Sequence, residues 1–104
     1  MKQVIEQIKA VIAKCKEEGK MFNLPSLNRD DVKVDRKDTG SYGSVLTSDE
    51  YNIVFDNGDW IKIIYESKDK DRPFQINPDR SVVTVTCSDP SLNFTGGWDE
   101  RLFS

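Results

Sequence analysis

The chain has 104 residues, with 15 Lys and Arg against 18 Asp and Glu, a formal net charge of −3 and no histidine. Its length fits a single domain over residues 1–104. The absence of histidine excludes a Ser-His-Asp or Cys-His catalytic set, a histidine-containing zinc site and an imidazole switch near neutral pH. Leu, Ile, Val and Phe make up 27 of the 104 residues, which is enough for a small hydrophobic core.

Membrane and disulfide classes are also disfavoured by the composition. Residues 1–20 carry charges throughout and lack the apolar stretch of a signal peptide, and no segment approaches the roughly 18 apolar residues of a membrane span. Cys15 and Cys87 are too few for a four-thiolate zinc site. We therefore expect a cytoplasmic protein with free thiols, no membrane partner and no metal or other cofactor.

Residues 2–18 have the spacing of an amphipathic helix. Gly19 follows them where a left-handed C-cap belongs. The apolar side chains of the segment recur at one-turn intervals and fill one core-facing stripe: Val4, Ile5, Ile8, Val11, Ile12 and Cys15.

Residues 51–66 predict a β-hairpin, because Asn57-Gly58 stands between two segments rich in β-branched and aromatic residues. A two-residue type I′ turn at this dipeptide would place Phe55 opposite Trp60 and Val54 opposite Ile61. Both faces of such a hairpin are largely apolar. A homodimer that hides one of these faces therefore stays open as an alternative.

Two further strands complete the predicted sheet. Residues 81–87 alternate with Val83, Val85 and Cys87 on one face, and residues 32–35 have the charges of a short edge strand. The predicted fold is α+β: an N-terminal amphipathic helix packed on a mostly antiparallel sheet of about four or five strands, with the 51–66 hairpin at its centre. Cys87, which ends its strand, is the better candidate for an accessible thiol, whereas Cys15 lies in the helix stripe.

Carboxylates supply two alternative chemistries. Asp38-Thr39-Gly40-Ser41 resembles the active-site motif of retroviral-type aspartic proteases, and this resemblance implies a carboxylate-only hydrolase acting as a dimer through Asp38. Charged residues precede this motif where the family has an apolar strand, so an ordinary turn is the simpler interpretation. Asp56 and Asp59 flank the hairpin turn and suggest a small-ligand or divalent-cation binding module, although the spacing matches no calcium loop.

Lysines line one flank of the predicted helix. Residues 1–22 contain five lysines and three glutamates, a net charge of +2, so the remainder carries −5. Lys9 and Lys16 belong to this flank and could contact an acidic partner, or their stems could cover the edge of the core. The overall acidity, with a pI near 4.9, argues against direct nucleic-acid binding as the principal function.

Three aromatic residues are candidates for partner contacts. Tyr42 lies in a glycine-rich loop, Trp98 follows Gly96-Gly97, and Trp60 stands close to Lys62. The segments 36–44 and 67–80 are the loops expected to reach the partner. Because the sequence has no catalytic set, it favours a non-enzymatic inhibitor that occludes a protein or ribonucleoprotein. Phage anti-defence proteins such as anti-CRISPRs and toxin-immunity proteins act in this way. The comparison with them rests on size and general character alone.

Overall fold

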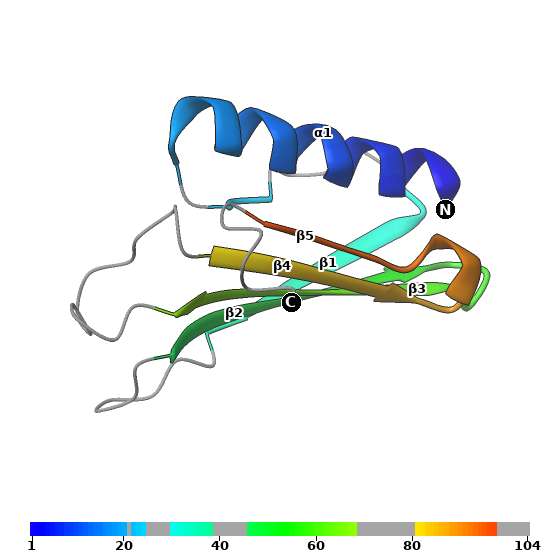
Figure 1. The fold of residues 1–104 in the computed structure, drawn as a ribbon. Coiled ribbons are helices and arrows are strands. Elements are labelled where there is room, and N and C mark those ends of the chain that lie inside the picture. The colour runs from blue at the N-terminus through cyan, green and yellow to red at the C-terminus, as the bar shows by residue number, and fades with distance from the viewer. Residues whose placement is uncertain (21, 25–29, 39–45, 69–80, 98–104) are drawn as a thin grey trace.

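The structure, a computed structural model, describes residues 1–20, 22–24, 30–38, 46–68 and 81–97, with the backbone alone at 38, 46–48, 67, 68 and 97. A helix lies across one face of a five-stranded antiparallel sheet whose strands follow one another in chain order (Figure 1). This arrangement confirms the predicted α+β fold. The elements are α1 (Lys2–Glu18), β1 (Val32–Asp38), β2 (Leu46–Phe55), β3 (Trp60–Lys68), β4 (Ser81–Cys87), the short 3-10 helix η2 (Pro90–Leu92) and β5 (Phe94–Gly97).

The helix α1 begins and ends where the sequence predicts. Gly19 follows it with φ 68° and ψ 28°, a left-handed conformation that glycine adopts without a Cβ clash. The Lys20 N–H then donates to the Cys15 carbonyl (2.9 Å), which satisfies a carbonyl at the helix end. Within the described parts of the chain, no helix has both the length and the apolar character needed to cross a membrane.

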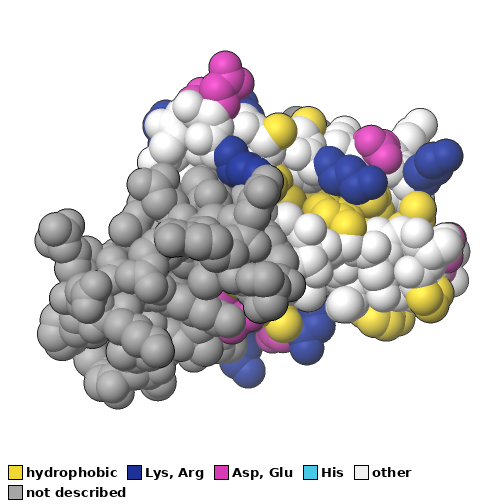
Figure 2. Space-filling model, in the orientation of Figure 1, with side chains coloured by type: hydrophobic (Ala, Val, Ile, Leu, Met, Phe, Trp, Pro, Cys, Tyr) yellow, Lys and Arg dark blue, Asp and Glu magenta, His cyan; other side chains and the backbone are white. Residues whose placement is uncertain are grey.

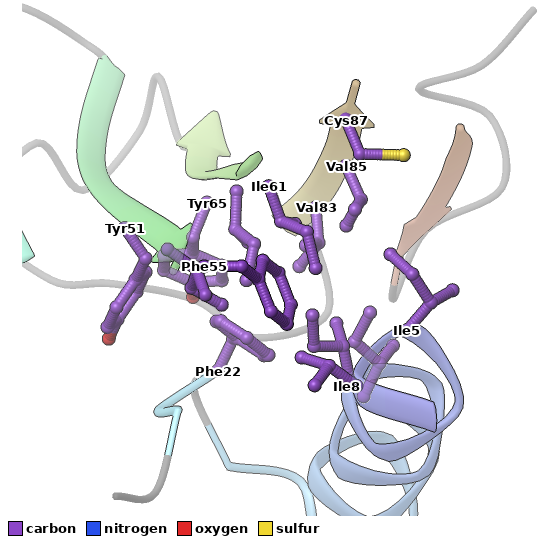
Figure 3. Close-up of a cluster of buried hydrophobic side chains, with 14 residues drawn as sticks. Ile5, Ile8, Phe22, Tyr51, Phe55, Ile61, Tyr65, Val83, Val85 and Cys87 are labelled. Carbon is purple, nitrogen blue, oxygen red and sulfur yellow. The ribbon is translucent and has the colours of Figure 1, made fainter. Parts of the chain in front are cut away.

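One continuous core lies between α1 and the facing side of the sheet, which we call the core face (Figure 3). From the helix it takes Val4, Ile5, Ile8 and Ile12, while Val11 and Cys15 are half-buried. Side chains alternate across a strand, so every second residue of β2, β3 and β4 points at the helix. These core-face residues are Tyr51, Ile53, Phe55, Ile61, Ile63, Tyr65, Val83, Val85 and Cys87, joined by Phe22 from the connection after α1.

The predicted turn of the β2–β3 hairpin is wrong. The Gly58 N–H donates to the Phe55 carbonyl (3.0 Å), and the Phe55 N–H donates to the Asp59 carbonyl (2.9 Å). Gly58 has a φ of 93°, and among the described residues only glycines have positive φ, so Asn57 does not adopt the type I′ conformation. Residues 56–58 instead form a three-residue hairpin loop, in which Gly58 forms a β-bulge after a tight turn.

This turn shifts the pairing of the hairpin by one residue from the prediction. Val54 pairs with Trp60, and Ile53 pairs with Ile61. A shift of one residue moves every side chain of a strand to the other face relative to its partner. Ile53 and Ile61 therefore share the buried core face, while Val54 and Trp60 share the opposite side of the sheet.

The two edges of the sheet also differ from the prediction. β1 continues to Asp38, three residues beyond the predicted end. β5 was not predicted, because Gly96 and Gly97 have low β propensity and read as breakers. Pairing with β4 forms this strand, and Gly96 lies beneath Ile12 of the helix at ordinary spacing: a Cβ at position 96 would lie 3.8 Å from the Ile12 side chain.

Candidate functional site

The side of the sheet opposite α1, which we call the outer face, carries the exposed apolar side chains of the hairpin. Trp60 is the first residue of β3 and is 43% exposed, and its direct partner Val54 on β2 is 51% exposed. Large exposed apolar side chains at directly paired positions form a patch of the kind that marks interaction sites, and tryptophan is enriched at the centres of interfaces. Exposure is concentrated at this hairpin end, since Val82 further along the outer face is buried.

Trp60 is held rigidly by Ser88, the residue after β4. The Trp60 N–H donates to Ser88 Oγ (3.2 Å), and the Ser88 N–H donates to the Trp60 carbonyl (3.0 Å). Ser88 Oγ also donates to Asp59 Oδ1 (3.1 Å), which fixes the turn beside the indole. The Trp60 backbone is thus locked between the hairpin turn and the end of β4 before any partner binds.

Charges of both signs surround the apolar pair on the outer face. Lys33 of β1 pairs with Val54, and Lys62 stands two residues after Trp60 on the same face. Lys62 Nζ lies 2.9 Å from Glu50 Oε1, and this hydrogen bond holds the pKa of Glu50 below its usual value of 4.5. The resulting surface is an aromatic and aliphatic centre with a mixed polar rim, which is the usual anatomy of a protein-binding site.

The candidate lysines Lys9 and Lys16 lie on α1, the layer opposite the outer face. Figure 2 shows Lys and Arg side chains spaced along the helix layer above exposed hydrophobic side chains. Lys9 Nζ lies 5.1 Å from the centre of the Phe94 ring and 3.8 Å from Glu6 Oε1, and Lys16 stands in the last helical turn, where a positive charge complements the helix dipole. The sheet separates both lysines from Trp60, and their contact with a partner stays a prediction.

Tyr42 and Trp98 lie outside the described residues, so their part in a site stays a prediction. The same holds for the segments 39–45 and 69–80, which contain most of the loops expected to reach a partner. Asp38 ends β1 with its backbone opposite Asp49, and the Thr39-Gly40-Ser41 part of the protease-like motif falls in the first of those segments.

Asp56 and Asp59 do not face one another across the turn, as the two-residue turn at Asn57-Gly58 would require. Phe55 faces Asp59, and the Asp56 N–H instead donates to the Asp31 carbonyl (3.0 Å) of the chain before β1. The Asp59 carboxylate accepts from the Asn57 side chain (3.1 Å) in addition to Ser88, so its oxygens serve the turn. Within the described residues, no group of three or more acidic or cysteine side chains is arranged to hold a metal ion.

The prediction that Cys87 offers an accessible thiol is also wrong. Its side chain is buried, and Sγ donates to the Asp89 carbonyl (2.9 Å). Asn93 Oδ1 accepts from the Cys87 N–H (2.8 Å), which closes the connection between β4 and β5. Cys15, in contrast, is half-buried, so the strand-end cysteine is the better protected of the two.

A partly buried polar cluster, which the sequence did not predict, lies at the far end of the core face. Asp49 is buried on β2, and Arg36 Nη2 of β1 donates to its carboxylate (3.0 Å). The same guanidinium lies 5.9 Å from the centre of the Tyr51 ring, and the Tyr65 hydroxyl shares a hydrogen bond with Ser81 Oγ (2.9 Å). Burial raises the pKa of both tyrosines above the usual 10.0, so their hydroxyls are neutral at neutral pH.

Phe22 joins this cluster to the rest of the core. Its ring packs edge-on against Tyr51, with centroids 5.6 Å apart, and stacks on Tyr65 at 6.3 Å. Figure 3 shows it lying between the sheet tyrosines and the helix. In the sequence, the cluster is indicated only by Arg36 and Asp49, which lie at the facing ends of β1 and β2. This indication can be recognised only once the pairing register of the two strands is known.

Comparison of the chain with protein-family models, with curated proteins and with solved structures found no match.

Proposed function

We propose that the protein is a non-enzymatic binding protein that occludes a macromolecular partner by docking the hairpin end of its outer face on it. The observation that carries this proposal is the exposed pair of Trp60 and Val54 on a rigid sheet. The partner is a protein or a ribonucleoprotein, and covering its working surface would inhibit it in the manner of phage anti-defence or toxin-immunity proteins.

The free energy available from Trp60 is sufficient for an interface anchor. A tryptophan that is 43% exposed can still remove about 100 Å² of mostly apolar surface from water, which is worth about 2–3 kcal/mol. Val54 adds a smaller apolar contribution beside it. This is the range of the residues that dominate interface energies, and the rigid backbone reduces the entropy lost on binding.

The charges around the anchor favour a protein surface over a bare phosphate backbone. Lys33 and Lys62 are accompanied on the same face by Asp35 and Glu50, so the rim has no excess of positive charge with which to bind nucleic acid. A partner with opposite charges at its own rim would be selected through this mixed pattern.

The test is affinity capture from the native host with three baits: the wild-type chain, the double variant Val54→Ser/Trp60→Ala, and Lys14→Ala as a control on the exposed side of α1. A stoichiometric partner should bind the wild type and the control and be lost from the double variant, which retains the core. The captured partner's activity should then fall on addition of the wild type alone. Equal capture by all three baits would disprove docking through the outer face.

A further inference from the structure

Three lysines, which we call the lysine row, run along one flank of α1. Lys2, Lys9 and Lys16 follow one another at intervals of seven residues, which is two helical turns and about 10 Å along the helix axis. All three side chains are exposed. The row belongs to the helix layer, so the sheet lies between it and Trp60 of the outer face.

The lysine row lies beside β5, at one edge of the sheet. Lys9 Nζ is 5.1 Å from the centre of the Phe94 ring, and Ile12 in the next helical turn lies above Gly96. β5 therefore runs along the same flank of the helix and in the same direction. Phe94 is half-buried and packs against the core, so part of its ring stays at the surface below the lysines.

The charges of the lysine row are not balanced by their neighbours. Within the described residues, Lys2 and Lys16 form no ion pair, and the pair of Lys9 with Glu6 spans 3.8 Å between two exposed side chains. An exposed pair of this kind contributes little. Residues 90–97, which form η2 and β5, contain no charged residue. The flank is thus a positive strip above an uncharged strand, on a chain whose net charge is −3.

We propose that the lysine row and Phe94 bind an acidic amphipathic helix of another protein, which lies along α1 above β5. Two helices that pack at a small crossing angle share a seven-residue spacing, so carboxylates two turns apart on the incoming helix would each meet one lysine. Apolar residues on the same side of that helix would cover Phe94. Charge complementarity at three successive positions, with an apolar contact at the middle one, favours this occupant.

Two other polyanions fit this surface less well. Nucleic-acid bases stack on an open aromatic face, but Lys9 lies over the Phe94 ring and the ring packs against the core. Glu6 and Glu17 are exposed on the solvent side of the row and would repel a continuous phosphate backbone. Recognition of an anionic membrane typically takes about four to eight clustered Lys or Arg, whereas this row spreads its charges over about 20 Å.

Titration with a synthetic peptide tests the proposal. The probe is an amphipathic helix of about 20 residues, with glutamates seven residues apart beside a leucine stripe. Isothermal titration calorimetry is run at about 0.1 M salt, where screening limits charge effects to about 10 Å. The peptide should bind saturably. A peptide of the same composition, with its glutamates moved to the side opposite the leucines, should bind about 10-fold more weakly.

Lys16→Glu and Lys14→Glu form a matched pair of variants. Both reverse one exposed charge in the second half of α1, but Lys14 projects from the other flank of the helix. Lys16→Glu should weaken peptide binding by about 5- to 10-fold, and Lys14→Glu should change it by less than about twofold. Phe94→Ala should also weaken binding, and its circular dichroism should match that of the wild type because the ring is only half-buried.

The inference does not depend on the proposed function, because it uses the helix layer and not the outer face. Val54→Ser/Trp60→Ala should therefore bind the peptide as the wild type does. Loss of peptide binding in that variant, equal weakening by Lys14→Glu and Lys16→Glu, or no saturable binding by the wild type would overturn the proposal. Equal or tighter binding of a single-stranded oligonucleotide, or of vesicles that contain anionic lipid, would overturn it as well.

Discussion

The two buried tyrosines of the core face provide a matched pair of hydroxyl deletions. Tyr51 and Tyr65 lie on neighbouring strands and both are fully buried. The Tyr65 hydroxyl is hydrogen bonded to Ser81 Oγ at 2.9 Å. The Tyr51 hydroxyl makes no hydrogen bond of good geometry with the described residues, although the Leu24 backbone and the Arg36 guanidinium lie close enough to oppose the rise in its pKa.

The difference in partners fixes the expected sign and size of each effect. Tyr65→Phe removes a buried neutral hydrogen bond and should lower the free energy of unfolding by about 1 kcal/mol. Tyr51→Phe removes a hydroxyl that is desolvated without a good partner, so stability should be unchanged or increase by up to about 1 kcal/mol. The two variants should therefore differ by about 1–2 kcal/mol, even though they delete the same atom.

Urea unfolding, followed by circular dichroism, measures this difference. With a slope of about 2 kcal/mol/M, the midpoints of the two variants should be separated by about 0.5–1 M at an unchanged slope. Ser81→Ala serves as the control on the Tyr65 hydrogen bond and should lower the midpoint as Tyr65→Phe does. Equal destabilisation by the two tyrosine variants would refute the assignment of partners.

The remaining predictions concern backbone, pH and surface charge. Gly58→Ala should cost about 1–2 kcal/mol in thermal or urea unfolding because its φ is 93°, whereas Gly96→Ala, with ordinary spacing to its neighbour, should stay within about 0.5 kcal/mol. Burial raises the folded-state pKa of Tyr51 and Tyr65 above the 10.0 of the unfolded chain. Their contribution to the free energy of unfolding is therefore complete below pH 10 and is lost as the pH rises through the folded-state pKa values. Measuring stability at increasing alkaline pH should show this decline, and the decline should be smaller in the tyrosine variants. Glu50→Gln should change stability barely measurably at neutral pH, and its depressed pKa confines any loss to acidification through and below 4.5.

Much of the fold could be predicted from local patterns. The stripe from Val4 to Ile12 has a period that only a helix can bury on one side, and Gly19 ends it. Residues 81–87 alternate cleanly between valine and threonine, so the strand and its buried face both follow. β5 could not be predicted, because its glycines have no strand preference of their own and form a strand only by pairing with β4.

The candidate site, like the fold, could be predicted only in part from the sequence. Trp60 is a plausible anchor from its residue type alone, but its exposed neighbour Val54 is identified only by the register. Alternation could not select that register, since Ile61, Ile63, Ile64 and Tyr65 make both faces of the second strand apolar. The ion pair between the exposed Arg36 and the buried Asp49 likewise depends on which residues of two strands meet.

The sequence by itself determined the helix, the position of the hairpin, the later strand and the α+β class, because each follows from local periodicity and turn chemistry. The tertiary structure decided which side of the sheet each side chain occupies. The bulge at Gly58 sets a pairing one residue away from that of a two-residue turn, and the helix then covers the face of Ile53 and Ile61. That packing leaves Trp60 and Val54 on the outside, because a strand has only two faces and the core takes one.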